Sequence, residues 1–158
     1  METAVRCSCG AVFSQSESTV THRYIRSIPE CWTCFGAVLA REYENAVLFG
    51  GVHQLTVDAY AVQHPVGQPA KSLVSHLVSL RLALHGGDGG PGAIKAFVES
   101  RHDFPTLVPP IDLGPLTVAD VAAATRPDEH RERVRDWAKQ AWAAWGEHHA
   151  LIATLLRV

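Results

Sequence analysis

The residues of this chain best suited to chemistry are four cysteines in two close pairs, Cys7 with Cys9 and Cys31 with Cys34. Two thiolates separated by only one or two residues can bind the same ion, because a local turn brings both sulfurs within about 2.3 Å of a tetrahedral metal. Four sulfur ligands favour zinc or an iron–sulfur cluster. We therefore predict that all four cysteines hold one metal ion, which we expect to be zinc, with another transition metal as the alternative.

The two pairs differ in how closely they match known zinc sites. The second pair has the spacing of a zinc knuckle and stands at the expected start of a helix, where the helix dipole and free N–H groups favour thiolate. The first pair is one residue shorter, although Gly10 gives the backbone the freedom that a tight turn needs. Cys34 can also be a small buried residue, in which case His22 or His53 would complete a site of three cysteines and one histidine.

Several histidines and one aspartate form a second group of candidates. Asp58 lies in an otherwise apolar segment, where a buried carboxylate must be paired, hydrogen-bonded or bound to a metal. Histidines on facing helices can form a metal or acid–base centre inside a bundle, and a hydrogen-bonded core histidine is the alternative for each. The predicted catalytic residues are His53, Asp58 and His64, and the predicted substrate-binding residues are Tyr60, His76 and His149.

The spacing of these candidates limits what they can do together. His53 and His64 lie eleven residues apart, which on a continuous helix is three turns and about 16 Å, so they share a face but not an ion. Glu42 forms no recognisable catalytic pattern with the histidines, and His130 is expected at a helix end or in a loop, so neither receives a role. The chain lacks H-E-x-x-H, a phosphate-binding loop and G-x-S-x-G.

The composition favours one folded domain spanning residues 1–158. The chain is 47% hydrophobic and 19% charged with a net charge of −2, which argues against a disordered chain and against a strongly basic nucleic-acid binder.

No stretch has the length of a signal peptide core or a membrane span, so we expect a cytoplasmic protein without membrane contact. In that reducing compartment the cysteines are better metal ligands than structural disulfides. A small-molecule partner and a homodimer are both left open.

The apolar pattern positions these residues on helices. Apolar residues recur at intervals of three and four after residue 30, and the segment 51–64 is apolar on most sides, so it should be the central helix. We therefore expect an all-α fold, a compact helical bundle (31–158) on which an irregular cysteine-bearing segment (1–30) packs as a loop or short hairpin. The expected elements are helices at 31–43, 51–64, 71–85, 92–101, 117–124 and from 127 to the end of the apolar stripe at Leu155, a flexible turn at 86–92 and an extended proline-rich strap at 104–115.

Six segments carry a family resemblance: CGA (9–11), ECW (30–32), VLAREY (38–43), VHQLTVDAYAVQHP (52–65), SLVSHLVSLRLAL (72–84) and WAKQAWAAWGEHH (137–149). On these segments the chain resembles a bacterial family of proteins whose function is not known. The resemblance implies no reaction. Cys34 is not part of the family pattern, and the spacing of the first cysteine pair is shorter than in that pattern. The site residues that the resemblance implies are Cys9, Cys31, His53, Asp58 and His64.

Three functions are consistent with these residues. In the first, the zinc ion is mainly structural, because a site with three or four thiolates leaves no position for water, and any chemistry comes from a pocket of histidines and Asp58. In the second, the protein is an enzyme whose ion is held by histidine, carboxylate and cysteine with an open position that activates water or oxygen. In the third, Cys31 and Cys34 form a reversible thiol pair for redox sensing or partner binding.

Overall fold

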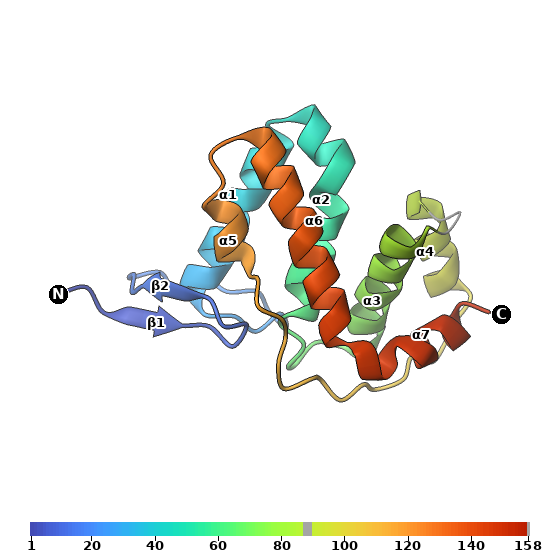
Figure 1. Cartoon of the computed structure of the whole chain (residues 1–158). Helices are drawn as coiled ribbons and strands as arrows, with labels where there is room; N and C mark the ends of the chain where they lie inside the picture. The colour runs from blue at the N-terminus through green and yellow to red at the C-terminus, as the bar shows by residue number, and fades with distance from the viewer. Residues whose placement is uncertain (87–89, 158) are drawn as a thin grey trace.

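The computed structural model describes residues 1–86 and 90–157 as a mainly α-helical protein with one small sheet (Figure 1), which confirms the predicted fold class. The sheet contains two antiparallel strands, β1 (Ala4–Arg6) and β2 (Val12–Ser14), which form the short hairpin expected near the N-terminus. The helices are α1 (Pro29–Tyr43), α2 (Ala46–Val62), α3 (Ala70–His85), α4 (Gly90–Glu99), α5 (Val118–Ala122), α6 (Pro127–Ala144), the 3-10 turn η1 (Gly146–His148) and α7 (His149–Leu155).

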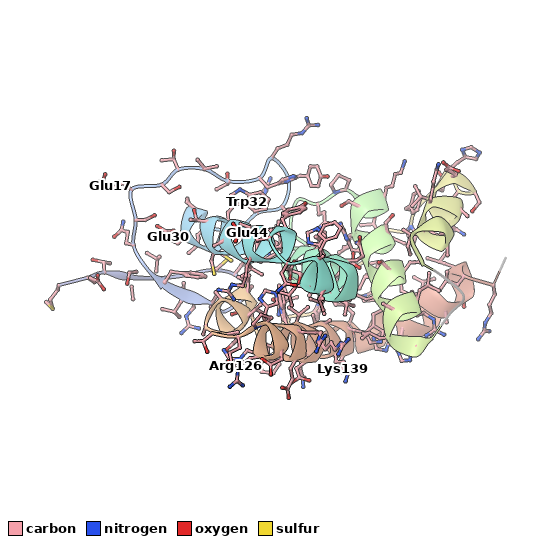
Figure 2. All side chains as sticks on the ribbon, turned by 90° about the horizontal axis from the view of Figure 1, so that it is seen from above. Glu17, Glu30, Trp32, Glu44, Arg126 and Lys139 are labelled. Carbon is pink, nitrogen blue, oxygen red and sulfur yellow. The ribbon has the colours of Figure 1, made fainter. Side chains whose placement is uncertain are left out.

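Helix α2 is the central element, as its apolar sequence predicted. It packs against α1, α3 and α6, and viewed from above α1 and α6 lie along opposite sides of the bundle, with Glu30 and Trp32 on one side and Arg126 and Lys139 on the other (Figure 2). Asn45 caps the start of α2, because its side chain accepts the backbone N–H groups of Val47 and Leu48. The helix therefore begins earlier than expected and buries much of its length among its neighbours.

The end of α2 corrects one prediction about the histidines. The helix ends at Val62, and Gln63 is its C-cap residue; Pro65, which has no backbone N–H, follows shortly after. His64 therefore lies beyond the helix, so the prediction that His53 and His64 share one face of a continuous helix is wrong. The Gln63 side chain donates to the carbonyls of Leu113 and Leu116, at the end of the strap and just after it, and accepts the indole N–H of Trp137, which fixes this end of α2.

The C-terminal helix is broken where a single long helix was expected. Helix α6 ends at Ala144, and a 3-10 turn containing Gly146 redirects the chain into α7, which packs against α3. Trp145 stands at the break, where it is fully buried and donates its indole N–H to the carbonyl of Val62. The apolar stripe continues through the break, so the sequence pattern did not predict where the helix ends.

The segment between α3 and α6 agrees with the sequence in most respects. Gly86 ends α3 in a left-handed conformation (φ +65°), whereas α4 begins at Gly90, so the expected turn at 86–92 is too long and its residues 87–89 lie outside the described part of the chain. The strap at 104–115 contains no helix or strand and runs beneath the bundle from α4 to α5 (Figure 1). Thr117 caps α5 as expected, in a capping box with Asp120.

Candidate metal centre

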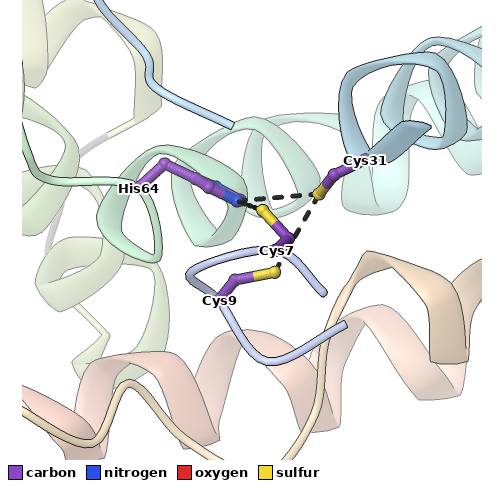
Figure 3. Close-up of side chains that lie close together, drawn as sticks. All are labelled: Cys7, Cys9, Cys31 and His64. Atoms are coloured by element: carbon purple, nitrogen blue, oxygen red, sulfur yellow. Dashed lines mark hydrogen bonds between the residues drawn. The ribbon is translucent and has the colours of Figure 1, made fainter. Parts of the chain in front are cut away.

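Three cysteines and one histidine meet in a buried group where the N-terminal hairpin joins the bundle (Figure 3). The ligand atoms of Cys7, Cys9, Cys31 and His64 all lie within 4.8 Å of one another. His64 Nε2 is 3.4 Å from the sulfur of Cys7 and 3.6 Å from that of Cys31, and the sulfurs of Cys9 and Cys31 are 3.9 Å apart. All four side chains are at least 96% buried. This group could hold a metal ion.

The turn between β1 and β2 presents two of the sulfurs. The backbone N–H of Cys7 donates to the carbonyl of Ala11, and the N–H of Gly10 donates back to the carbonyl of Cys7. Gly10 has a φ of +99°, a conformation that side chains strongly disfavour. The tight turn that Gly10 permits brings Cys7 and Cys9 to the same side, which explains how one intervening residue is enough.

The other two ligands come from the ends of two helices. Cys31 lies in the first turn of α1, which begins with Pro29, a residue well suited to that position. His64 follows the C-cap of α2, and its Nδ1 lies 2.7 Å from the carbonyl oxygen of Tyr60. Because a carbonyl only accepts, Nδ1 carries a hydrogen, so in the neutral ring Nε2 is the nitrogen with the lone pair, directed toward the sulfurs. The imidazole is therefore held in the tautomer that a metal ligand needs.

Tyr60 packs beside the group of three cysteines and His64. Its hydroxyl lies 2.9 Å from Ser27 Oγ and 3.5 Å from the sulfur of Cys31, and it can donate its hydrogen to either of them. Its ring stacks on Phe35 at a centroid distance of 3.9 Å. Burial and the neighbouring thiol of Cys31 raise the pKa of the Tyr60 hydroxyl, which keeps it protonated and able to donate. Tyr60 thus lies beside the ligands, and its predicted contact with a substrate stays a prediction.

The electrostatics of the group favour charge separation between sulfur and imidazole. Hydrogen bonds from Cys31 and Cys9 hold the pKa of Cys7 far below its usual value, and the same contacts together with burial raise the pKa of Cys31. Burial alone would lower the pKa of His64, but its hydrogen bonds to Cys7 and Cys9 and the nearby negative charge raise it to about 9. The lowered pKa of Cys7 favours a thiolate in this group, the form of cysteine that binds metals.

Cys34 is not a member of this group. It is half-buried on α1, and burial together with the nearby Cys9 raises its pKa to about 11. Neither histidine considered as a replacement takes its place. His22 accepts the backbone N–H groups of Tyr24 and Ile25, and His53 bonds elsewhere. The fourth position belongs to His64, which the sequence placed among the catalytic candidates.

His53 belongs to a second buried network, centred on Glu42. The Glu42 carboxylate is fully buried and accepts from His53 Nδ1 at 3.0 Å, from His130 Nε2 at 2.8 Å and from the hydroxyl of Thr56. Arg41 lies 3.2 Å from His130 Nδ1. Since arginine only donates, this contact leaves the ring hydrogen on His130 Nε2, where it points at Glu42. Both oxygens of the Glu42 carboxylate are therefore hydrogen-bonded.

The sequence assigned no role to Glu42 or His130, yet both are fully buried in this network. His130 lies near the start of α6, in agreement with its expected place at a helix end. A usable signal was present in both helices. Glu42 continues the buried stripe of α1 at a spacing of four after Val38, and His130 begins the buried stripe of α6 four residues before Val134. A polar residue on such a stripe needs a partner.

Asp58 and His76 meet in a third place, between α2 and α3. One oxygen of the buried Asp58 carboxylate lies 2.8 Å from His76 Nδ1 and 2.9 Å from the amide nitrogen of Gln54, and the other accepts the hydroxyl of Ser79. Of the three outcomes expected for the buried Asp58 carboxylate, the structure therefore shows hydrogen bonding. The candidates His53, Asp58, Tyr60, His64 and His76 bond within three separate groups along α2.

The last substrate-binding candidate, His149, lies apart from all three groups. Its ring stacks on Trp142 at a centroid distance of 3.9 Å, and its Nε2 lies 2.8 Å from the Trp142 carbonyl. It connects the start of α7 to α6 across the helix break, which gives it a place in the packing of the C-terminal region. Its predicted contact with a substrate stays a prediction.

The fold and site define a mainly α-helical protein with a buried group of three cysteines and one histidine that could hold a metal ion. The chain belongs to a family of unknown function (DUF5946), whose model matches residues 4–146, and this confirms the family resemblance in kind. No curated protein and no solved structure matches the chain. Within the described residues, no helix has the length and apolar character needed to cross a membrane.

Proposed function

We propose that this protein binds one zinc ion through Cys7, Cys9, Cys31 and His64, and that the ion stabilises the fold by joining the N-terminal hairpin to the helical bundle. The observation that supports the proposal is the spacing of the donor atoms. Zinc bonds of about 2.3 Å to sulfur and about 2.0 Å to nitrogen, at tetrahedral angles, separate two sulfurs by about 3.8 Å and sulfur from nitrogen by about 3.5 Å. Three of the six distances between the donor atoms, 3.9, 3.4 and 3.6 Å, match these values, and all six are below 4.8 Å.

The completeness of the ligand set favours a structural ion over a catalytic one. Four protein ligands fill the tetrahedral coordination of zinc, whereas catalytic zinc sites usually have three and keep one position for water or substrate. All four side chains are buried, which would also keep solvent from the ion. A metal-dependent reaction would require an open position, and the geometry of these ligands provides none.

The location of the group supports the same role. The hairpin has only three residues in each strand, and a hairpin of this size is marginally stable on its own. Its turn provides two ligands, α1 provides one and the end of α2 provides the fourth, so one ion would connect three segments that lie 22 to 57 residues apart in sequence. Closing loops of this length restricts the unfolded chain and so favours the folded one.

Metal analysis of untagged protein tests this proposal directly. We expect one zinc per chain by elemental analysis, and X-ray absorption at the zinc edge should give three sulfur and one nitrogen neighbours. Protein without metal, or an ion with a water ligand and fewer than four protein ligands, would overturn the structural role. Cys31→Ser should lose the ion, whereas the matched Cys34→Ser variant on the same helix should keep it.

A further inference from the structure

A cavity of about 610 Å³ lies on the bundle, away from the four metal ligands, where residues of α2, α3 and α6 meet. Its lining includes residues 49–55 of α2, Ala83 of α3 and Arg135 of α6. The volume falls in the range of about 300–1,000 Å³ that is typical of small-molecule sites. Its wall contains apolar groups such as Leu55, one histidine and one arginine. A mainly apolar wall with a few polar groups is the usual composition of a ligand site.

His53 lines this cavity, and a hydrogen bond to Glu42 fixes the orientation of its ring. Its Nδ1 hydrogen points to the buried carboxylate of Glu42, so in the neutral imidazole the lone pair is on Nε2. No other described residue bonds to that nitrogen. The ring is held between Phe49 and Tyr43, at centroid distances of 4.7 and 4.9 Å, and about 15% of the side chain is exposed. A histidine oriented by a carboxylate with its other nitrogen unused is a positioned hydrogen-bond acceptor.

Arg135 supplies the positive charge of the site. It is exposed on α6, and it forms no ion pair with any residue that the structure describes. Its guanidinium matches the two oxygens of a carboxylate, and one arginine balances the single charge of a monocarboxylic acid. The carboxylate of Glu42, on α1, is already committed to His53, Thr56 and His130.

Glycines keep the cavity open along α2. A Cβ atom added to Gly50 would meet nothing within 4 Å, and one added to Gly51 would meet only the flexible side chain of Arg131 at 3.9 Å. Both glycines lie within a helix, where each costs stability relative to alanine. The space that they leave is therefore open to a ligand approaching the backbone.

We propose that this cavity binds a small organic acid whose carboxylate pairs with Arg135 and whose hydroxyl group donates a hydrogen bond to His53 Nε2. The site is independent of the proposed zinc ion, because it shares none of the four ligands. Glu42 acts as a positioning residue that holds the imidazole, and the apolar residues of the lining contact the carbon skeleton of the acid.

Three probe molecules separate the parts of this proposal. NMR titrations of the zinc-loaded full chain with 3-hydroxybenzoate should perturb the His53 ring nitrogens and give a Kd of about 1 mM, as expected for a ligand of ten heavy atoms. Benzoate, which lacks the hydroxyl, should bind several-fold more weakly, and the uncharged 3-hydroxybenzamide about tenfold more weakly. Equal binding of the amide and the acid, or no perturbation of His53 by any probe, would overturn the proposal.

Matched variants locate the site. Arg135→Gln should abolish the preference for the acid over the amide, whereas Lys139→Gln, one turn further along the same exposed side of α6 (Figure 2), should retain it. Gly51→Leu should fill the cavity and reduce binding at least tenfold, and Gly36→Leu makes the same change on α1, where the added side chain also meets open space. Unchanged binding in Gly51→Leu would contradict the location. His53→Gln should lose only the preference for the hydroxyl.

Discussion

Two buried polar groups lie near the two ends of α2, and they differ in how well protein hydrogen bonds satisfy their polar atoms. Near the start of the helix, the Glu42 network joins a carboxylate to two imidazoles and a hydroxyl, and both carboxylate oxygens accept hydrogen bonds of 3.0 Å or less. Beyond the end of the helix, the cysteine group has contacts of 3.4 to 3.9 Å between weak donors and weak acceptors. Protein groups satisfy the carboxylate of the first group, whereas the proposed zinc ion would complete the second.

Metal removal should produce the largest difference between these two groups. Structural zinc sites contribute apparent binding free energies of about 10–16 kcal/mol at pH 7, so a chelator should destabilise the fold strongly. We expect Tm to fall by at least about 10 °C on treatment with EDTA, and in the Cys31→Ser variant, since 1 kcal/mol corresponds to about 2–4 °C at this chain length. Differential scanning calorimetry measures this change. An unchanged Tm after complete removal of the metal would contradict the stabilising role.

Breaking the Glu42 network should cost less and leave the metal in place. Glu42→Leu removes the acceptor of three buried donors, which we expect to destabilise the protein by about 3–5 kcal/mol. Glu42→Gln keeps one acceptor oxygen and should cost less. Urea unfolding followed by zinc analysis of the folded variant gives both quantities. Loss of zinc from folded Glu42→Leu would show that the two ends of α2 are not independent.

Tyr60→Phe should weaken the metal group without dismantling it. The variant keeps the ring stacked on Phe35 but removes the hydroxyl beside Cys31 and Ser27. Outer-shell hydrogen bonds typically change metal affinity by about 10–100-fold, and stability should fall by about 1 kcal/mol. Competition with a zinc chelator measures the affinity. Tyr43→Phe, at an exposed position, is the control and should match the original protein.

The smallest effect concerns Cys34, which should report the state of the group without altering it. Its pKa is raised to about 11 by burial, so it stays a neutral thiol near pH 7 and its alkylation by iodoacetamide should accelerate about tenfold per pH unit up to about pH 10. Mass spectrometry should find at most one modified cysteine in the zinc-loaded protein and four after chelation. Modification of Cys7, Cys9 or Cys31 in the loaded protein would contradict their role as ligands.

The fold could be predicted from the sequence because its local signals agree with its packing. The helical spacing of α1 and α3, the cap at Thr117 and the proline strap each depend on a few neighbouring residues. The break at Trp145 could not be predicted in the same way, because the apolar stripe passes through it and the redirection depends on the packing of α7 against α3.

The metal group was only partly predictable, for a related reason. Three of the four residues follow from cysteine chemistry and spacing, whereas His64 becomes a ligand only because α2 ends before it and Tyr60 fixes its ring. The second cysteine pair looked like a knuckle, but its members lie on a helix, where residues three apart share one side only approximately, and Cys34 remains outside the group. Spacing identifies candidate ligands, and tertiary structure selects among them.

The position of His64 also sets the order in which the protein can assemble. Its partner Cys7 precedes it by 57 residues, so during synthesis the hairpin leaves the ribosome well before the last ligand exists. An ion that binds early can have only cysteine ligands from this group until α2 is complete. Full coordination of the proposed ion would therefore be a late event, because it requires the N-terminal segment and the central helix to be packed against each other.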